Sequence, residues 1–116
     1  MTRTLDGARA VANVTQQLVA RAERQVDGVL AAELWQPTLP AWRRAAARAT
    51  LQVRIAGEAA ELDGKTFSAA PAEHPTVLLV DGIHTLLAAQ SGETVSGLWS
   101  SHPLIAELAR KALAGA

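Results

Sequence analysis

The feature that most constrains the fold is a short apolar run, Val77 to Val80, which is closed by Asp81 and a glycine. A run of this length with β-branched members, ended by a turn signal, is typical of a strand buried on both faces. In a small domain such a strand is usually central, with other strands on both sides. The polar residues next to it, His74 and Thr76 before it and Asp81 after it, are therefore expected at the two ends of the sheet.

The rest of the sequence predicts helices and strands that cover and extend this strand. Apolar residues at three- and four-residue spacing predict a helix over 8–24. A second helix is expected over 39–49, with Thr38 as its N-cap and Pro40 in its first turn. A last helix is expected from Pro103, capped by Ser101, with four apolar residues as its buried stripe: Leu104, Ile105, Leu108 and Leu113.

Further strands are expected around the central one. They cover residues 27–34, 51–55, 83–89 and 94–100, with a short edge strand near 66–69 inside a loop over 58–73. The last three strands of the chain are spaced as an antiparallel meander. The predicted fold class is α/β, a single mixed β-sheet flanked by helices, in one domain over residues 1–116.

Composition narrows the classes of function. Eleven basic and eleven acidic residues cancel, so we expect no direct contact with nucleic acid. We also expect no role at a membrane, because the apolar runs are too short. There is no cysteine, and no apolar run approaches the ~20 residues of a membrane span. The first residues do not resemble a signal segment, and the expected location is the cytoplasm.

Each candidate site residue has two interpretations. His74 and Asp81 are either an acid and base from neighbouring segments or ordinary loop and turn residues. Arg54, opposite the apolar face of its strand, is either solvated or an anion-binding group. Trp99 is a core residue or a ligand platform, and Ser101 a cap or a ligand contact. The three histidines lack metal-site spacing, so neither a metal nor a cofactor is expected.

The central strand also carries a family resemblance. His74, Thr76 and Asp81 stand at the marked positions of the H-x-K-x-x-x-x-D signature of phospholipase D-like proteins, with threonine in place of the lysine. In that family the histidine is the nucleophile or acid, the lysine binds phosphate, and two motifs face each other across two repeats or two subunits. The resemblance therefore implies a phospholipase D-like half that forms a homodimer.

A second resemblance covers about residues 5–114. Leu5 and Gly7 before the first helix, Val77 to Gly82, and the segment Gly97 to Pro103 are similar to the effector domain of TrmB-type transcriptional regulators, which sense sugars. The winged helix that binds DNA in that family is missing here, so the chain is either the effector part alone or a standalone relative.

The resemblance implies ligand sensing and dimerisation without catalysis, because Thr76 cannot supply the charge of the missing lysine. No catalytic residue is therefore assigned, and a small polar ligand such as a sugar is expected to bind eight residues: His74, Thr76, Asp81, Arg54, Trp99, Ser101, Glu33 and Trp35. One alternative is a homodimeric phosphodiesterase or nuclease in which Lys65, Arg54 or a partner's cation replaces the lysine. The other alternative is a plain dimerisation module.

Overall fold

The computed structural model describes residues 1–115. Its strands are β1 (Thr2–Asp6), β2 (Gln25–Ala31), β3 (Thr50–Ala56), β4 (Ala60–Leu62), β5 (Lys65–Phe67), β6 (Ala69–Ala70), β7 (Thr76–Val80), β8 (His84–Ser91) and β9 (Thr94–Ser100). Its helices are α1 (Ala8–Ala20), the short 3-10 helix η1 (Ala32–Leu34), α2 (Trp35–Ala46) and α3 (Pro103–Ala114). Seven strands form one mixed sheet in the order β1-β9-β8-β7-β2-β3-β6, and β4 pairs with β5 in a separate hairpin.

The predicted central strand is confirmed. β7 is the fourth of the seven strands, all five of its residues are buried, and it pairs antiparallel with both β2 and β8. Because side chains alternate along a strand, Leu78 and Val80 join the main core while Val77 and Leu79 face the other side. The meander of β7, β8 and β9 is confirmed by their antiparallel pairing.

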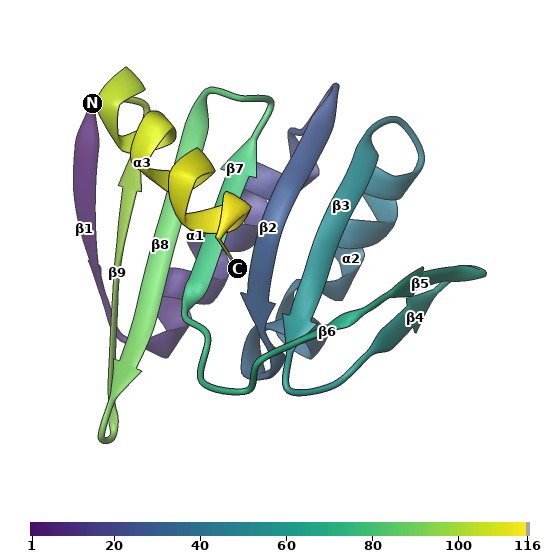
Figure 1. Ribbon diagram of the computed structural model, residues 1–116, viewed down its shortest axis with the longest axis horizontal. Coiled ribbons are helices and arrows are strands. Elements are labelled where there is room, and N and C mark those ends of the chain that lie inside the picture. Colours follow the sequence, from purple (N-terminus) through teal and green to yellow (C-terminus); the bar gives the residue numbers. More distant parts are fainter. Residues whose placement is uncertain (116) are drawn as a thin grey trace.

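Two helical layers cover the sheet, which confirms the predicted α/β class. α1 and α2 lie side by side on one face, and α3 crosses the opposite face over β7 and β8 (Figure 1). The main core lies between the sheet and the α1–α2 layer, and its largest fully buried side chain is Trp42. Burial of such aromatic and aliphatic surface is the principal stabilising term, at roughly 25 cal/mol per Å² of apolar area.

The start of α2 differs from the prediction. α2 begins at Trp35, so Thr38 is its fourth residue and not its cap. The buried Thr38 hydroxyl donates to the Leu34 carbonyl at 2.5 Å and accepts from Trp42 Nε1 at 2.9 Å. Two prolines suggested a break before the helix. Pro37 lies in the first turn, where no N–H is needed, and Pro40 removes only one helical hydrogen bond.

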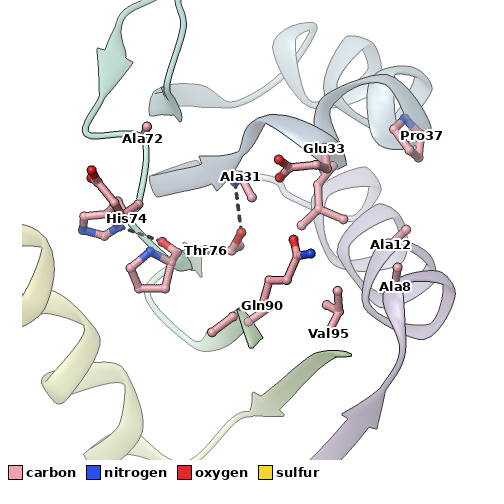
Figure 2. Close-up of a pocket in the computed structure, with 15 residues that line it drawn as sticks. Ala8, Ala12, Ala31, Glu33, Pro37, Ala72, His74, Thr76, Gln90 and Val95 are labelled. Atoms are coloured by element: carbon pink, nitrogen blue, oxygen red, sulfur yellow. Dashed lines mark hydrogen bonds between the residues drawn. The ribbon is translucent and has the colours of Figure 1, made fainter. Parts of the chain in front are cut away.

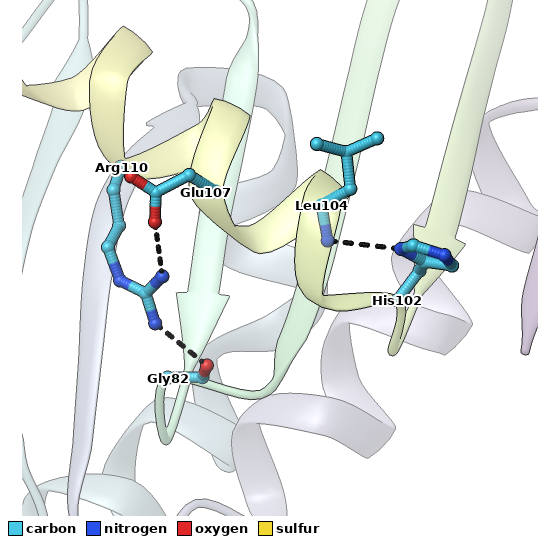
Figure 3. A network of polar contacts seen from close by, with 5 residues as sticks. All are labelled: Gly82, His102, Leu104, Glu107 and Arg110. Carbon is cyan, nitrogen blue, oxygen red and sulfur yellow. Dashed lines mark hydrogen bonds and ion pairs between the residues drawn. The ribbon is translucent and has the colours of Figure 1, made fainter.

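The buried face of α3 also differs from the prediction. Ala106 and Ala109 are buried against the sheet, whereas Leu104 and Leu108 are 60% and 56% exposed. The sheet surface below is already filled by strand side chains, so small alanines let the helix approach closely. His102, and not Ser101, caps the helix, since its Nδ1 accepts from the Leu104 N–H at 3.0 Å (Figure 3).

The remaining differences are at strands with few apolar residues. β1 was not predicted, because Leu5 is its only buried residue. The predicted loop over 58–73 contains the β4–β5 hairpin, turned by Asp63 and Gly64 at positive φ, and the edge strand β6. The strand predicted over 27–34 is displaced by two or three residues, since Ala32–Leu34 form η1.

Candidate functional site

A cavity of about 370 Å³ opens at one end of the sheet. It lies where β2 and β8 end, where β7 begins, and where α1 and α2 start. Figure 2 shows the labelled residues around it, with Glu33, Thr76 and Gln90 directed toward the space between α1 and the loop that carries His74. In α/β sheets, crevices beyond strand ends are a common place for ligands.

Thr76, at the position of the motif lysine, is the buried polar group at the base of this cavity. Its residue is 1% exposed, and its Oγ1 accepts a hydrogen bond from the Ala31 backbone N–H at 3.0 Å (Figure 2). That contact ties the start of β7 to the end of β2. A hydroxyl that accepts one bond keeps its own proton to donate, so Thr76 can offer a hydrogen bond but no positive charge.

His74 lies beside Thr76 and has a fixed ring orientation. Its Nδ1 is 2.6 Å from the Pro75 carbonyl oxygen. Because a carbonyl can only accept, Nδ1–H is the donor, and in the neutral ring Nε2 is the nitrogen that accepts. His74 is half-buried, and its Nε2 makes no hydrogen bond within residues 1–115.

The cavity also contains polar residues that sequence reasoning missed. Glu73 and Gln90 line it together with the predicted Glu33. The signals were present but weak: Glu73 is the neighbour of His74, and Gln90 is near the end of the strand that pairs with the start of β7. Among the fifteen lining residues there are two glutamates and no lysine or arginine, so the site is acidic.

Small and apolar side chains form the remaining wall. Ala8 and Ala12 come from the first turns of α1, Leu34 and Pro37 from the start of α2, and Val95 from the start of β9. Alanines on α1 keep the space open because larger side chains there would fill it. The amino ends of both helices meet at this cavity, and free N–H groups of helix first turns can donate to ligand oxygen atoms.

Asp81, the last motif residue, is at the opposite end of β7 from the cavity. Its carboxylate accepts from three consecutive backbone N–H groups, of Glu23 at 3.0 Å, Arg24 at 2.7 Å and Gln25 at 3.0 Å. Partial burial raises the pKa of this carboxyl, but the three N–H donors outweigh that effect and hold its pKa below its ordinary value. Asp81 therefore joins the turn after α1 to the turn after β7.

The structure also separates four other predicted residues from the cavity. Arg54 is on the α3 side of the sheet, in an open groove with Asp27, whose pKa is raised by burial. Trp99 and Ser101 are at the far end of β9 from Val95, and the Trp99 ring stacks on His84 at 5.9 Å. Trp35 packs on Trp42 and Phe67, with ring centroids 6.2 and 5.2 Å apart.

Neither candidate for a replacement cation within the chain reaches His74. Lys65 Nζ donates to the Ala46 carbonyl at the end of α2, and Arg54 is across the sheet. Within residues 1–115, no three histidine, aspartate or glutamate side chains are grouped so as to hold a metal ion. No helix of this part of the chain is long and apolar enough to cross a membrane.

Comparison with solved structures identifies the class of fold. The chain superposes on Nuc from Salmonella typhimurium, a phospholipase D family member, with a TM-score of 0.60 and 10% identity over 99% of this chain and 92% of that one. NucT from Helicobacter pylori gives a TM-score of 0.67 at 9% identity, over 99% and 94% of the two chains. The chain therefore has the phospholipase D-like fold, as the motif around β7 predicted.

The TrmB-type resemblance is also confirmed at the level of the fold. TrmBL2, an archaeal chromatin protein that binds DNA, superposes with a TM-score of 0.70 at 10% identity and covers 98% of this chain. The chain spans half the length of TrmBL2. No protein-family profile and no curated protein sequence matches this chain.

Proposed function

We propose that this chain is a non-catalytic, small-molecule-sensing and dimerisation domain of a TrmB-like transcriptional regulator, acting in the cytoplasm. Its ligand is a small neutral polar molecule, of which a sugar is the best match, and it binds in the cavity beside His74. Three residues of the predicted set form this site, His74, Thr76 and Glu33, and Gln90 and Glu73 complete it.

The observation that carries the proposal is the charge of the cavity. A phosphodiester site must stabilise negative charge that develops on phosphate oxygens, which preorganised cations supply. Here the motif lysine is Thr76, the lining holds Glu33 and Glu73, and no lysine or arginine lines it. A phosphate group in this cavity would be repelled by the two carboxylates, whereas a neutral ligand would not.

The available hydrogen-bonding groups suit a polyhydroxyl ligand. Carboxylates of Glu33 and Glu73 and the free Nε2 of His74 accept from hydroxyl groups, while Thr76 and the helix first turns donate. Alanine, proline and valine side chains supply an apolar wall for the C–H face of a sugar ring. Sensing then requires only that the ligand binds one of two states more tightly than the other.

Dimerisation is supported by a patch of the sheet that α3 leaves uncovered. Val77, Leu87 and Leu98 form an apolar surface on that side, and Leu87 and Leu98 are half-buried. The patch and the cavity share four residues, Pro75, Thr76, Ala88 and Ala89. A second copy seated there would bring two cavities toward the twofold axis, so ligand binding and the dimer interface would be coupled.

A phosphodiesterase is the second candidate, because the free Nε2 of His74 is placed as an acceptor and the fold is that of a phospholipase D family member. This alternative requires a cation from the partner subunit at the shared edge of the cavity. It predicts turnover of a generic phosphodiester that is abolished by His74→Ala.

The test is a thermal-shift screen of the purified chain against sugars, sugar phosphates and nucleotides, with its mass in solution recorded alongside. A true ligand at a hundredfold excess over its dissociation constant stabilises the fold by about 2.7 kcal/mol. We expect His74→Ala to abolish the response. His102→Ala, which removes a histidine from the α3 cap outside the cavity, should keep it.

Three outcomes separate the candidates. A saturable response to a neutral sugar that depends on His74, without diester turnover, supports the sensor. Turnover that is lost in His74→Ala supports the phosphodiesterase and refutes the sensor. A dimer that responds to no compound of a broad library supports the plain dimerisation module. Leu87→Lys should then yield monomers, because it places a charge in the apolar patch of the dimer interface.

A further inference from the structure

The balanced net charge of the chain conceals an uneven distribution. The layer formed by residues 8–22 and 34–49, which contains α1 and α2, holds five of the eleven basic residues and none of the eleven acidic ones. The acidic side chains are therefore on the sheet, the loops, η1 and α3, and Glu23 and Glu33 stand just outside this layer, after α1 and before α2. α1 and α2 pack side by side on one face of the sheet (Figure 1), so the basic side chains of this layer gather on one broad face of the molecule.

Within the described part of the chain, four of the five arginines of this face make no polar contact that would stabilise the fold. Arg9, Arg21, Arg43 and Arg44 are exposed, and within residues 1–115 their guanidinium groups make no hydrogen bond or ion pair. The fifth, Arg48, is different. It donates to the Ala20 and Ala22 carbonyls at the end of α1 and so joins the two helices.

The other exposed residues of the two helices are four polar, uncharged ones and the small apolar residues Ala8, Pro37 and Pro40. Asn13, Gln16 and Gln17 on α1 and Gln36 on α2 are exposed in the same layer as the arginines. With 13 and 12 residues, α1 and α2 each extend about 20 Å, at 1.5 Å per residue. Arginine, asparagine and glutamine side chains on parallel helices are suited to contact phosphate and sugar oxygens along such a length.

We propose that the outer face of α1 and α2 is a binding surface for the phosphate backbone of double-stranded DNA, independent of base sequence. It lies on the opposite side of the sheet from α3 and is distinct from the ligand cavity. The net charge of zero, from which no nucleic-acid contact was expected, does not describe this face. The structural similarity to TrmBL2, which binds DNA, is consistent with this assignment but does not carry it.

The character of the face favours a duplex over other polyanions. Single strands are held by exposed aromatic rings, but Trp42 is fully buried and Trp35 packs between Trp42 and Phe67. Anionic membranes are bound by helices that add exposed apolar side chains to basic ones. The large apolar residues exposed among those described are Met1, Ile83, Leu104 and Leu108, and none of them is on α1 or α2.

The test is fluorescence anisotropy of a labelled duplex of about 24 base pairs and arbitrary sequence, titrated at several KCl concentrations with the full chain. Each phosphate contact contributes about −0.9 to the slope of log K against log salt. We expect Arg43→Gln/Arg44→Gln to reduce that slope by nearly 2. Arg110→Gln/Lys111→Gln removes the same formal charge from α3, on the other face, and should leave the slope unchanged.

The outcomes are decisive in each case. A smaller salt dependence of duplex binding in the α2 variant alone, with unchanged thermal unfolding, supports the proposal. Absence of duplex binding at 50 mM KCl overturns it, as does an equal loss in the α3 variant. Tighter binding of single strands or of phosphatidylserine vesicles, with the same dependence on Arg43 and Arg44, would overturn the assignment to duplex DNA. The response to sugars is measured separately, so either proposal can fail alone.

Discussion

Replacing Asp81 tests whether the last motif residue joins two turns or binds a ligand. We compare Asp81→Ala with Asp81→Asn, because both remove the charge but asparagine keeps one acceptor oxygen. Asp81 also has φ of 54°, a left-handed conformation that asparagine tolerates and alanine does not favour. Comparison of the two variants therefore separates the contribution of the hydrogen bonds to stability from that of the backbone strain.

The structure gives the expected size of the effect. Three backbone N–H groups lose their carboxylate partner in Asp81→Ala, and since water can replace it, each loss costs about 0.5 kcal/mol, at the low end for a hydrogen bond. The left-handed backbone adds about 1 kcal/mol for alanine alone. We expect Asp81→Ala to lower the free energy of unfolding by roughly 2.5 kcal/mol and Asp81→Asn by about 1 kcal/mol.

The assay is urea unfolding followed by tryptophan fluorescence, between pH 7 and pH 3. The folded-state pKa of Asp81 is lowered, so its contribution is present above the unfolded-state pKa and is lost as the pH falls through the folded-state value. The difference between wild type and Asp81→Asn should therefore shrink toward pH 3. Equal stabilities of all three proteins at pH 7, or a difference that grows in acid, would refute this account of Asp81.

Three further substitutions test the packing. Gly28→Ala should abolish folding, because a Cβ at residue 28 would lie 1.9 Å from the Val77 carbonyl oxygen and force β2 away from β7. A soluble variant that unfolds cooperatively would contradict the pairing register of β2 and β7. Thr38→Val should cost about 1–3 kcal/mol in urea unfolding, since it leaves buried Trp42 Nε1 without an acceptor; an unchanged midpoint would exclude that bond. Thr85→Val should be neutral or stabilising by up to about 1 kcal/mol, because the buried Thr85 hydroxyl has no hydrogen-bond partner among the described residues. A destabilised variant would indicate that the hydroxyl does have such a partner.

The sequence predicts the elements that have strong periodicity. The buried strand β7, the alternation of Val53 and Ile55 in β3, and the span of β9 are all found in the structure. Weakly patterned elements are missed, because a strand with a single buried residue, such as Leu5 in β1, carries no period. The stripe predicted on α3 is wrong at Leu104 and Leu108, because close contact with the sheet selects alanine over the more apolar leucine. Ile105 and Leu113 of the predicted stripe are half-buried.

The candidate site was predicted only where the strand ends determine it. Thr76 begins the central strand and His74 lies two residues before it, so their position at the rim followed from the burial of that strand. Arg54 and Trp99 were grouped with them because sequence alone does not show which face or which end of a strand a residue occupies. Gln90 and Glu73 required the pairing of β7 with β8 and the course of the preceding loop.

The most direct test of the central claim is a comparison of one sugar with its own phosphate in the cavity. Isothermal titration of the wild-type chain with a neutral hexose identified by the screen, and with the corresponding hexose phosphate, measures both affinities under one condition. The account predicts that the neutral sugar binds and that its phosphate binds at least tenfold more weakly, because Glu33 and Glu73 line the cavity without a cation. Preferential binding of the hexose phosphate would contradict this prediction and would support the alternative that the cavity is a phosphodiesterase site.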